Sequence, residues 1–249
     1  MNSENKKATL YIAATPIGNM DDITFRAIRL LKDTDVLACE DTRHTRKIFT
    51  RHQIQLPKII FSYHEHNEGK AGNKILKFLQ EGKNVVLCSD AGTPGLSDPG
   101  YRIISAALQA GHHVDIIPGA SAVTAALLAS GLPTSSFTFK RFPPRKEGQR
   151  KRFLALEKDV PHTLIFFESP HRVEVFLKEA GDIFGDRLAA VCIDLTKMYE
   201  EVHRGYLDEL GQLFSGKKIK GEVTIVVSGS NPKFTRRSAP GTKPILTTD

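Results

Sequence analysis

Short apolar runs and amphipathic segments alternate along most of the chain. The apolar runs are rich in Val, Ile and Leu and end at glycine or polar residues, which is typical of strands buried in a sheet. Between them, apolar residues recur at helical spacing, as in residues 22–32, where Ile23, Ala27 and Leu31 share one face. This alternation predicts β/α units with mainly parallel strands. The strands expected in the first half are residues 10–15, 35–39, 58–61, 84–88 and 113–117.

A second series of strands and helices follows a Gly/Pro/Ser stretch. A helix expected over residues 121–130 ends at Gly131, and LPTSS after it continues neither pattern. We therefore expect an N-terminal α/β domain over residues 1–132 and a C-terminal α/β domain over residues 133–230. Residues 231–249 are polar and punctuated by proline, which predicts a disordered tail. The strands expected in the second domain are residues 136–139, 163–167, 188–193 and 222–228.

Polar loops follow the expected strands. Ligands of open α/β sheets bind at the carboxyl ends of the strands, so these loops mark one edge as the place for chemistry. SDAGTPGLSDPG is the clearest of them, because Gly92, Gly95 and Gly100 permit positive φ while Asp90 and Asp98 offer carboxylates to a small ligand. The others are TPIGN (15–19), EDTRHT (40–45), SYHEH (62–66), PGAS (118–121), ESPHR (168–172) and DLTK (194–197).

The chain lacks the sequence motifs of several enzyme classes. The chain contains no G-x-G, which a nicotinamide or flavin site on a Rossmann strand requires, and no G-x-S-x-G elbow of a hydrolase. Cys39, Cys88 and Cys192 lie in apolar runs without metal-ligand spacing, which predicts buried thiols in a reduced core. We expect no metal site.

Charge is concentrated in one segment. The formal net charge is +7, and residues 140–152, KRFPPRKEGQRKR, hold seven Lys/Arg against one Glu. Such a cluster is either a solvated helix face or a surface for a polyanion, and its concentration favours nucleic acid. We found neither a signal-peptide pattern nor an apolar run of membrane-spanning length, so we expect a cytoplasmic protein.

Several motifs together carry a family resemblance. LYIAATPIGNMDDIT, LACEDTRHT, SYHEHNE, SDAGTPGLSDPG, PGASA, FESPHR, LTK and GEV, in this order, resemble the bacterial 16S rRNA 2′-O-ribose methyltransferases that act on a cytidine of the decoding centre. These enzymes form a branch of the tetrapyrrole-methylase superfamily. The resemblance implies a two-domain tetrapyrrole-methylase-like α/β fold, with a mainly parallel N-terminal sheet and a mixed C-terminal sheet. It also implies a homodimer, S-adenosylmethionine folded in a cleft between the domains, and the small ribosomal subunit as substrate.

Site residues follow from the resemblance and from side-chain chemistry. Glu40 or Asp41 would accept the hydroxyl proton or orient the ribose, Arg43 would hold phosphate, and Lys197 would stabilise the oxygen or contact RNA. The competing interpretation is a capped turn in which Asp41 or Thr42 starts a helix. RNA contacts are expected from His44, Arg145, Lys146, Arg150 and Lys151. The cofactor set that the resemblance implies is Pro16, Asp90, Ala91, Gly92, Thr93, Ser97, Asp98, Pro118, Gly119, Ser121, Ala122, Phe167, Glu168 and Leu195.

The chain departs from the family pattern at two places. Ile193 and Asp194 replace an Arg-Glu pair, and Arg141 replaces the glycine that precedes a phenylalanine. The first change removes a rigid bidentate donor. Two alternatives therefore stay open: a methyltransferase acting on a porphyrin or corrin precursor, and a catalytically degenerate RNA-binding protein.

Overall fold

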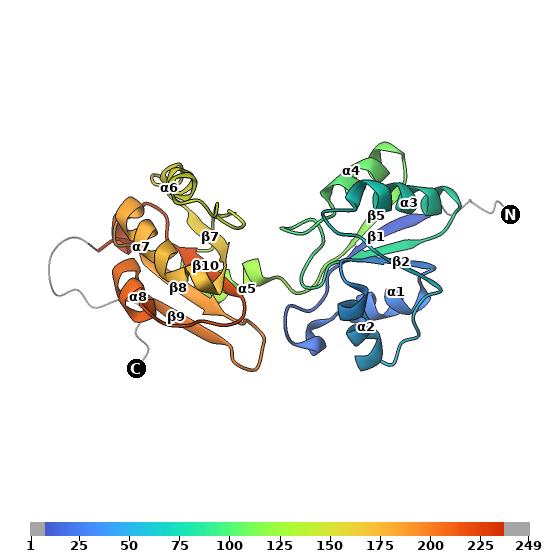
Figure 1. Cartoon of the computed structure of the whole chain (residues 1–249), viewed down its shortest axis with the longest axis horizontal. Helices are drawn as coiled ribbons and strands as arrows, with labels where there is room; N and C mark the ends of the chain where they lie inside the picture. The colour runs from blue at the N-terminus through green and yellow to red at the C-terminus, as the bar shows by residue number, and fades with distance from the viewer. Residues whose placement is uncertain (1–7, 237–249) are drawn as a thin grey trace. The chain divides into compact units, whose positions relative to one another are not determined.

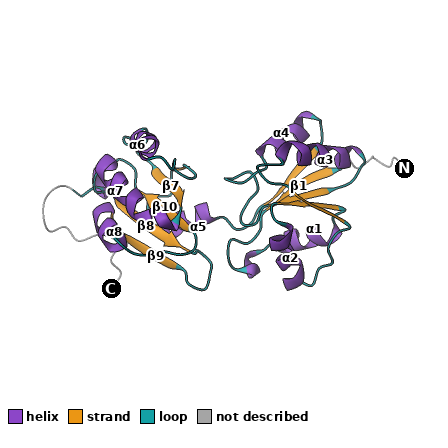
Figure 2. Ribbon diagram, viewed as in Figure 1, coloured by secondary structure: helices purple, strands orange, loops and turns teal. Residues whose placement is uncertain are grey.

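The computed structural model describes residues 8–236, which form two compact units (Figures 1 and 2). The first unit is Met1–Ser121 and the second is Ala122–Asp249. Each unit is built around its own five-stranded sheet. The two units therefore have separate hydrophobic cores.

The first unit has a parallel sheet with strand order β3-β2-β4-β1-β5. Helices α3 and α4 cover one face of this sheet, and α1 and α2 cover the other (Figure 1). This arrangement buries both faces, which explains why the strands are continuous apolar runs. The elements are β1 (Thr9–Ala13), η1 (Met20–Asp22), α1 (Phe25–Asp33), β2 (Val36–Cys39), α2 (Thr42–Arg51), β3 (Ile59–Ser62), α3 (Glu68–Gln80), β4 (Val85–Cys88), α4 (Tyr101–Gln109) and β5 (His113–Ile117).

The strand register brings the polar loops to one edge of this sheet. Cys88, the last residue of β4, lies opposite Ala13 of β1 and Cys39 of β2. Ala13 in turn lies opposite Ile117, the last residue of β5. Four strands thus end at one level, and the loops that follow them start side by side. The expected parallel sheet with its loops at a common edge is confirmed.

The second unit has a mixed sheet with strand order β6-β7-β10-β8-β9. Only β6 and β7 pair in parallel; the other neighbours are antiparallel. Helices α7 and α8 pack against each other, and their apolar faces join one core with β7, β8 and β10. The elements are α5 (Ala122–Ser130), β6 (Phe137–Phe139), α6 (Glu147–Ala155), β7 (Thr163–Glu168), η2 (Pro170–Arg172), α7 (Val173–Phe184), β8 (Leu188–Ile193), β9 (Glu201–Tyr206), α8 (Leu207–Phe214), β10 (Val223–Val227) and η3 (Pro232–Phe234).

The structure differs from the expected elements in three places. Strand β9 was not expected, because EVHRGY is polar and pairs only at the sheet edge, where one row of backbone groups faces solvent. Helix α5 belongs to the second unit, since it packs on β8, β9 and β10, so the units divide before the Gly131 boundary. Within the expected tail, Pro232–Phe234 form η3, and Thr235 pairs with Arg187. Residues 237–249 lie outside the described residues.

All three cysteines are buried and free, as expected. Across residues 8–236 we find no helix that combines the length and the apolar character needed to span a bilayer.

Candidate functional site

The carboxyl ends of β2 and β4 are joined by three acidic residues. The Asp41 backbone N–H donates to Oδ1 of Asp90 (3.0 Å), and the Asp90 backbone N–H donates to Oε2 of Glu40 (3.4 Å). Each strand end thus supplies a carboxylate to the other strand's backbone. This reciprocal pairing fixes two neighbouring loops and holds three carboxyl groups at one edge of the first sheet.

Asp41 serves as the cap of α2. Its Oδ1 accepts from the Arg43 backbone N–H (2.8 Å), and its carboxylate also receives Nε and Nη2 of the Arg43 guanidinium. The side-chain and backbone hydrogen bonds from Arg43 hold the pKa of Asp41 well below its usual range. A carboxylate stabilised in this way is a poor proton acceptor, so the structure favours the capping interpretation for Asp41.

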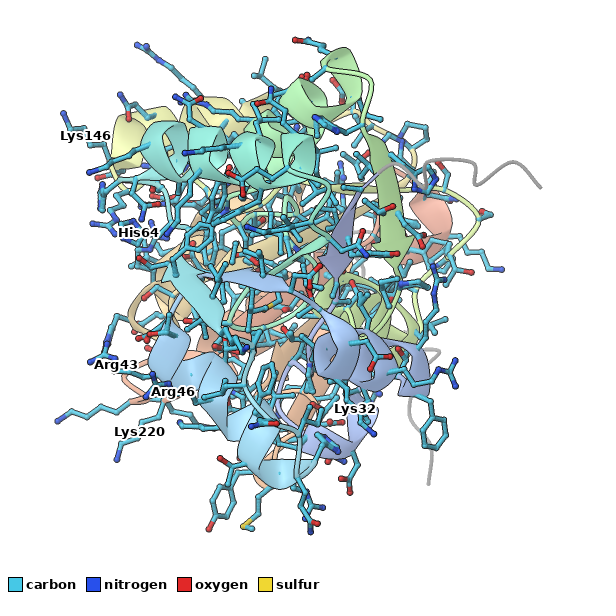
Figure 3. The ribbon with its side chains drawn as sticks, turned by 90° about the vertical axis from the view of Figure 1, so that its right-hand side faces the viewer. Lys32, Arg43, Arg46, His64, Lys146 and Lys220 are labelled. Atoms are coloured by element: carbon cyan, nitrogen blue, oxygen red, sulfur yellow. The ribbon has the colours of Figure 1, made fainter. Side chains whose placement is uncertain are left out.

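Arg43 is nevertheless exposed, and it is part of a basic helix face. Arg43 and Arg46 project from α2 on the same side of the first unit, as Figure 3 shows. Helix α2 carries no acidic residue, and His44 is half-buried within its first turn. The helix begins at the three acidic residues and carries basic side chains along its exposed face.

The glycine-rich loop after β4 adopts the conformation that its glycines allow. Gly92, Gly95 and Gly100 all have positive φ, as expected. At Gly100 a Cβ atom would lie 2.8 Å from the Gly95 backbone nitrogen, so no other residue fits there. Gly92 also exchanges two backbone hydrogen bonds with Thr15 (2.8 and 3.1 Å), which ties this loop to the end of β1.

The loop after β5 approaches the end of β1 from the other side. A Cβ atom on Gly119 would lie 2.9 Å from Cβ of Ala14, so only glycine lets the backbone come this close. The Ala14 N–H donates to the Ile117 carbonyl (3.1 Å), which fixes the approach. Pro118 and Gly119 remain exposed. Three loops therefore converge at β1 and present backbone groups together with carboxylates.

Glu168 ends β7 in the second unit and is almost fully buried. Its Oε1 accepts from the Ser169 backbone N–H (2.6 Å) and pairs with the Arg172 guanidinium (2.5 Å). Burial raises the pKa of Glu168, while the Ser169 N–H and the Arg172 charge oppose that rise. Glu168 thereby anchors the turn that follows β7.

A tight turn after β8 holds Lys197 in place. Its Nζ lies 2.6 Å from Oδ1 of Asp194 and 3.3 Å from Oε2 of Glu222. Burial alone would lower the pKa of Lys197, but these two carboxylates raise it above the ordinary value. Asp194 has φ of 49°, and a Cβ on Gly221 would collide with its carboxylate. Lys197 is thus a fixed ammonium donor and not a base.

The basic segment divides into exposed and buried members. Arg145 and Lys146 are exposed, and neither forms an ion pair within residues 8–236; Lys146 extends outward at the start of α6 (Figure 3). Lys151 is partly exposed and pairs with Glu147 at i,i+4 (2.6 Å). Arg150 does not fit the expected RNA contact, because its side chain is buried and paired with a carboxylate of α7.

The cofactor candidates are distributed over both units. The first unit holds Pro16, Asp90, Ala91, Gly92, Thr93, Ser97, Asp98, Pro118, Gly119 and Ser121, and the second unit holds Ala122, Phe167, Glu168 and Leu195.

Sequence reasoning missed Arg172 and Glu222, which orient Glu168 and Lys197. Arg172 stands four residues after Glu168 in FESPHR, so the opposite charges of these two near neighbours were the available signal. Glu222 gave no such signal, because it lies far along the chain.

Comparisons with known proteins identify the family of this chain. The family model for tetrapyrrole (corrin/porphyrin) methylases matches residues 9–211. The ribosomal RNA small subunit methyltransferase I of Halalkalibacterium halodurans is 47% identical over 227 residues, which cover 91% of this chain and 78% of that protein. The protein of the same name from Micromonospora olivasterospora is 45% identical and covers 91% of this chain and 72% of its own length. The chain belongs to the ribosomal RNA small subunit methyltransferase I family of tetrapyrrole methylases.

A solved structure supports the fold. The cobalamin biosynthetic enzyme cobalt precorrin-4 methyltransferase superposes with a TM-score of 0.65 at 20% identity, covering 92% of this chain and 98% of that one. At this identity the likeness concerns the fold alone. It confirms the tetrapyrrole-methylase-like α/β fold that the motifs implied.

Proposed function

We propose that this protein transfers a methyl group from S-adenosylmethionine to the ribose 2′-oxygen of a cytidine in the decoding centre of 16S rRNA. The observation that carries the proposal is the 47% identity, over 91% of the chain, to a ribosomal RNA small subunit methyltransferase I. The joined carboxylates at the ends of β2 and β4, in the EDTRHT and SDAGT motifs, would supply the acid–base chemistry.

The loops of the first unit fit a zwitterionic nucleoside such as S-adenosylmethionine. Gly92 and Gly119 bring backbone groups close to the end of β1, and Asp90 and Asp98 provide carboxylates suited to hydroxyl or ammonium groups. Gly119 carries particular weight, because any side chain there would meet Ala14. The bound cofactor would supply an electrophilic methyl group. The first-unit cofactor candidates would hold it.

Glu40 is the carboxylate best placed to orient the ribose and to take the hydroxyl proton. Asp41 is committed to the α2 cap and to Arg43, and Asp90 Oδ1 receives the Asp41 N–H. Glu40 touches the Asp90 N–H only at 3.4 Å, so it keeps acceptor capacity. The ammonium of Lys197 would stabilise negative charge on the attacking oxygen. Arg43 would bind a neighbouring phosphate, while Arg145 and Lys146 would bind phosphates farther along the RNA.

The homodimer, the cytoplasmic location and the small ribosomal subunit as partner belong to the same proposal. The homodimer rests on the family resemblance, the cytoplasmic location rests on the sequence patterns, and the small ribosomal subunit rests on the names of the relatives. Sedimentation equilibrium measures the first of them. A monomer at micromolar concentration would remove the dimer from the proposal without touching the chemistry.

Competing substrates test the proposal. The purified protein is incubated with methyl-labelled S-adenosylmethionine and either small ribosomal subunits lacking the modification or uroporphyrinogen. We expect label in the RNA and none in the tetrapyrrole. Label in the tetrapyrrole alone would identify a small-molecule methylase, and the absence of both methyl transfer and cofactor binding would favour the degenerate RNA-binding protein.

A further inference from the structure

An exposed aromatic ring stands beside the basic segment in the second unit. The side chain of Phe142 is 54% exposed, although phenylalanine is normally buried. Its inner side rests on Phe167, with ring centroids 5.5 Å apart, and Phe167 packs on Phe139 at 4.7 Å. Phe142 is therefore the outermost ring of a three-ring cluster whose rings meet at tilted or edge-to-face angles. Its exposed side is open to a ligand.

The loop that carries Phe142, residues 141–146, is held rigidly from below; we call it the platform loop. The Phe167 N–H donates to the Arg141 carbonyl (3.0 Å), and Nη1 of Arg172 donates to the Pro143 carbonyl (3.4 Å). Nη1 of the buried Arg150 donates to the Arg145 carbonyl (2.8 Å). Two consecutive prolines add fixed φ angles. A loop fixed in this way loses little entropy when it binds a ligand.

Backbone strain points to a function in the same loop. Arg141 has φ of 57°, a left-handed conformation that costs a non-glycine residue free energy. Strained backbone conformations of this kind cluster at functional sites, where the position of the side chain is needed despite the free-energy cost of the conformation. Here the conformation places an exposed arginine directly before Phe142. Arg145 and Lys146, which follow Phe142 in the sequence, are also exposed.

We propose that the open face of Phe142 is a stacking platform for an unpaired RNA base, with Arg141, Arg145 and Lys146 contacting the phosphates on either side. Proteins bind single-stranded RNA with aromatic rings flanked by cationic side chains. The rings stack on the bases, and the cations contact the negatively charged phosphates. The cations decide the occupant, since an apolar protein partner would leave the charges of Arg145 and Lys146 without counter-ions. The platform rests on the proposed function and deepens it, because methyl transfer to a single 2′-oxygen requires that the target nucleotide be held in one position.

Fluorescence tests the platform directly, because the chain contains no tryptophan. F142W places a single indole on the platform, and F25W places one at another highly exposed phenylalanine, 83% exposed, in the first unit. The probes are a short single-stranded oligocytidylate and an RNA duplex of the same charge. We expect the oligocytidylate to quench F142W and the duplex not to, with F25W unaffected by both. Equal quenching by the duplex, or quenching that grows with protein concentration without RNA, would overturn the proposal.

Affinity gives an independent measure. F142L keeps the apolar contact with Phe167 but removes the aromatic face, so oligocytidylate binding should weaken roughly five- to hundredfold, with its salt dependence unchanged. F142Y should bind like the wild type, and F25L serves as the matched control. Wild-type affinity in F142L would refute the platform.

Methyl transfer to small ribosomal subunits, measured in parallel, separates this inference from the proposed function. A wild-type protein that methylates, with F142L unimpaired in RNA binding, would refute the platform alone. An inactive wild type whose F142W variant is quenched by oligocytidylate would refute the proposed reaction and leave the platform as an RNA-binding surface.

Discussion

Arg150 and Glu179 form a buried bidentate ion pair in the second unit. Nε of Arg150 lies 2.6 Å from Oε2 of Glu179, Nη2 lies 2.8 Å from Oε1, and each side chain is only 6% exposed. The hydrogen bonds that Arg150 donates to the Glu179 carboxylate raise the pKa of Arg150. Because Nη1 of the same guanidinium holds the Arg145 carbonyl, this pair supports the platform loop from α7. The most buried cation of the basic segment therefore positions the exposed ones.

Removing one member of this pair should destabilise the second unit. E179A leaves a buried guanidinium without its counter-ion, and we expect the free energy of unfolding to fall by about 3–5 kcal/mol. The double variant R150M/E179L removes both charges and should recover most of that loss. Urea denaturation followed by circular dichroism measures both. Equal losses in the two variants would show that packing, and not the unpaired charge, sets the cost.

The exposed cations should govern the salt dependence of RNA binding. R145Q/K146Q should reduce the magnitude of the slope of log Kd against log salt by about 1 to 2, since each lost phosphate contact removes about 0.7 for single strands. K217Q/K218Q removes the same charge from exposed lysines of the same unit and serves as the control. If the control lowers the slope as much as R145Q/K146Q does, net charge and not the platform loop attracts the RNA.

The strain at Arg141 should be measurable as a gain in stability. R141G removes the left-handed penalty, so we expect the free energy of unfolding to rise by about 1 kcal/mol. RNA affinity should fall in the same variant, because the guanidinium is lost. R145G, at a position without positive φ, should show no gain. A stability unchanged by R141G would mean that the arginine side chain recovers the backbone cost through its own contacts.

Substitutions of the neighbouring carboxylates Glu40 and Asp41 should differ in their effect on kcat. E40Q removes the proton acceptor and should lower kcat about a hundredfold or more at unchanged affinity for S-adenosylmethionine. D41N keeps an N-cap oxygen at the start of α2 and should affect kcat much less. Single-turnover methylation with calorimetry of cofactor binding measures both quantities. A larger kcat loss in D41N than in E40Q would reverse the assignment.

The sequence predicted the parts of this fold that depend on local patterns. Runs such as NVVLC read as buried strands because both sheet faces are covered, and glycine punctuation located the loop after β4 with its positive φ angles. It did not reveal β9, since an edge strand needs little apolar character. It also could not tell Arg150 from Arg145. Burial is decided by Glu179, which lies 29 residues away along the chain and carries no local signal.

The departures from the family pattern have a partial structural account. Asp194 keeps the Lys197 ammonium in place despite its shorter side chain, because Gly221 leaves room for the carboxylate. Ile193 is simply buried at the end of β8. The ammonium thus stays in position, which supports an active enzyme over a degenerate one.

Locating the transferred methyl group tests the central proposal most directly. Small ribosomal subunits lacking the modification are incubated with the protein and methyl-labelled S-adenosylmethionine, and the RNA is digested with nuclease and analysed by mass spectrometry. The proposed function predicts label on the ribose 2′-oxygen of one decoding-centre cytidine, lost in E40Q. Label on a base, label at another nucleotide, or no label while S-adenosylmethionine binds would contradict it.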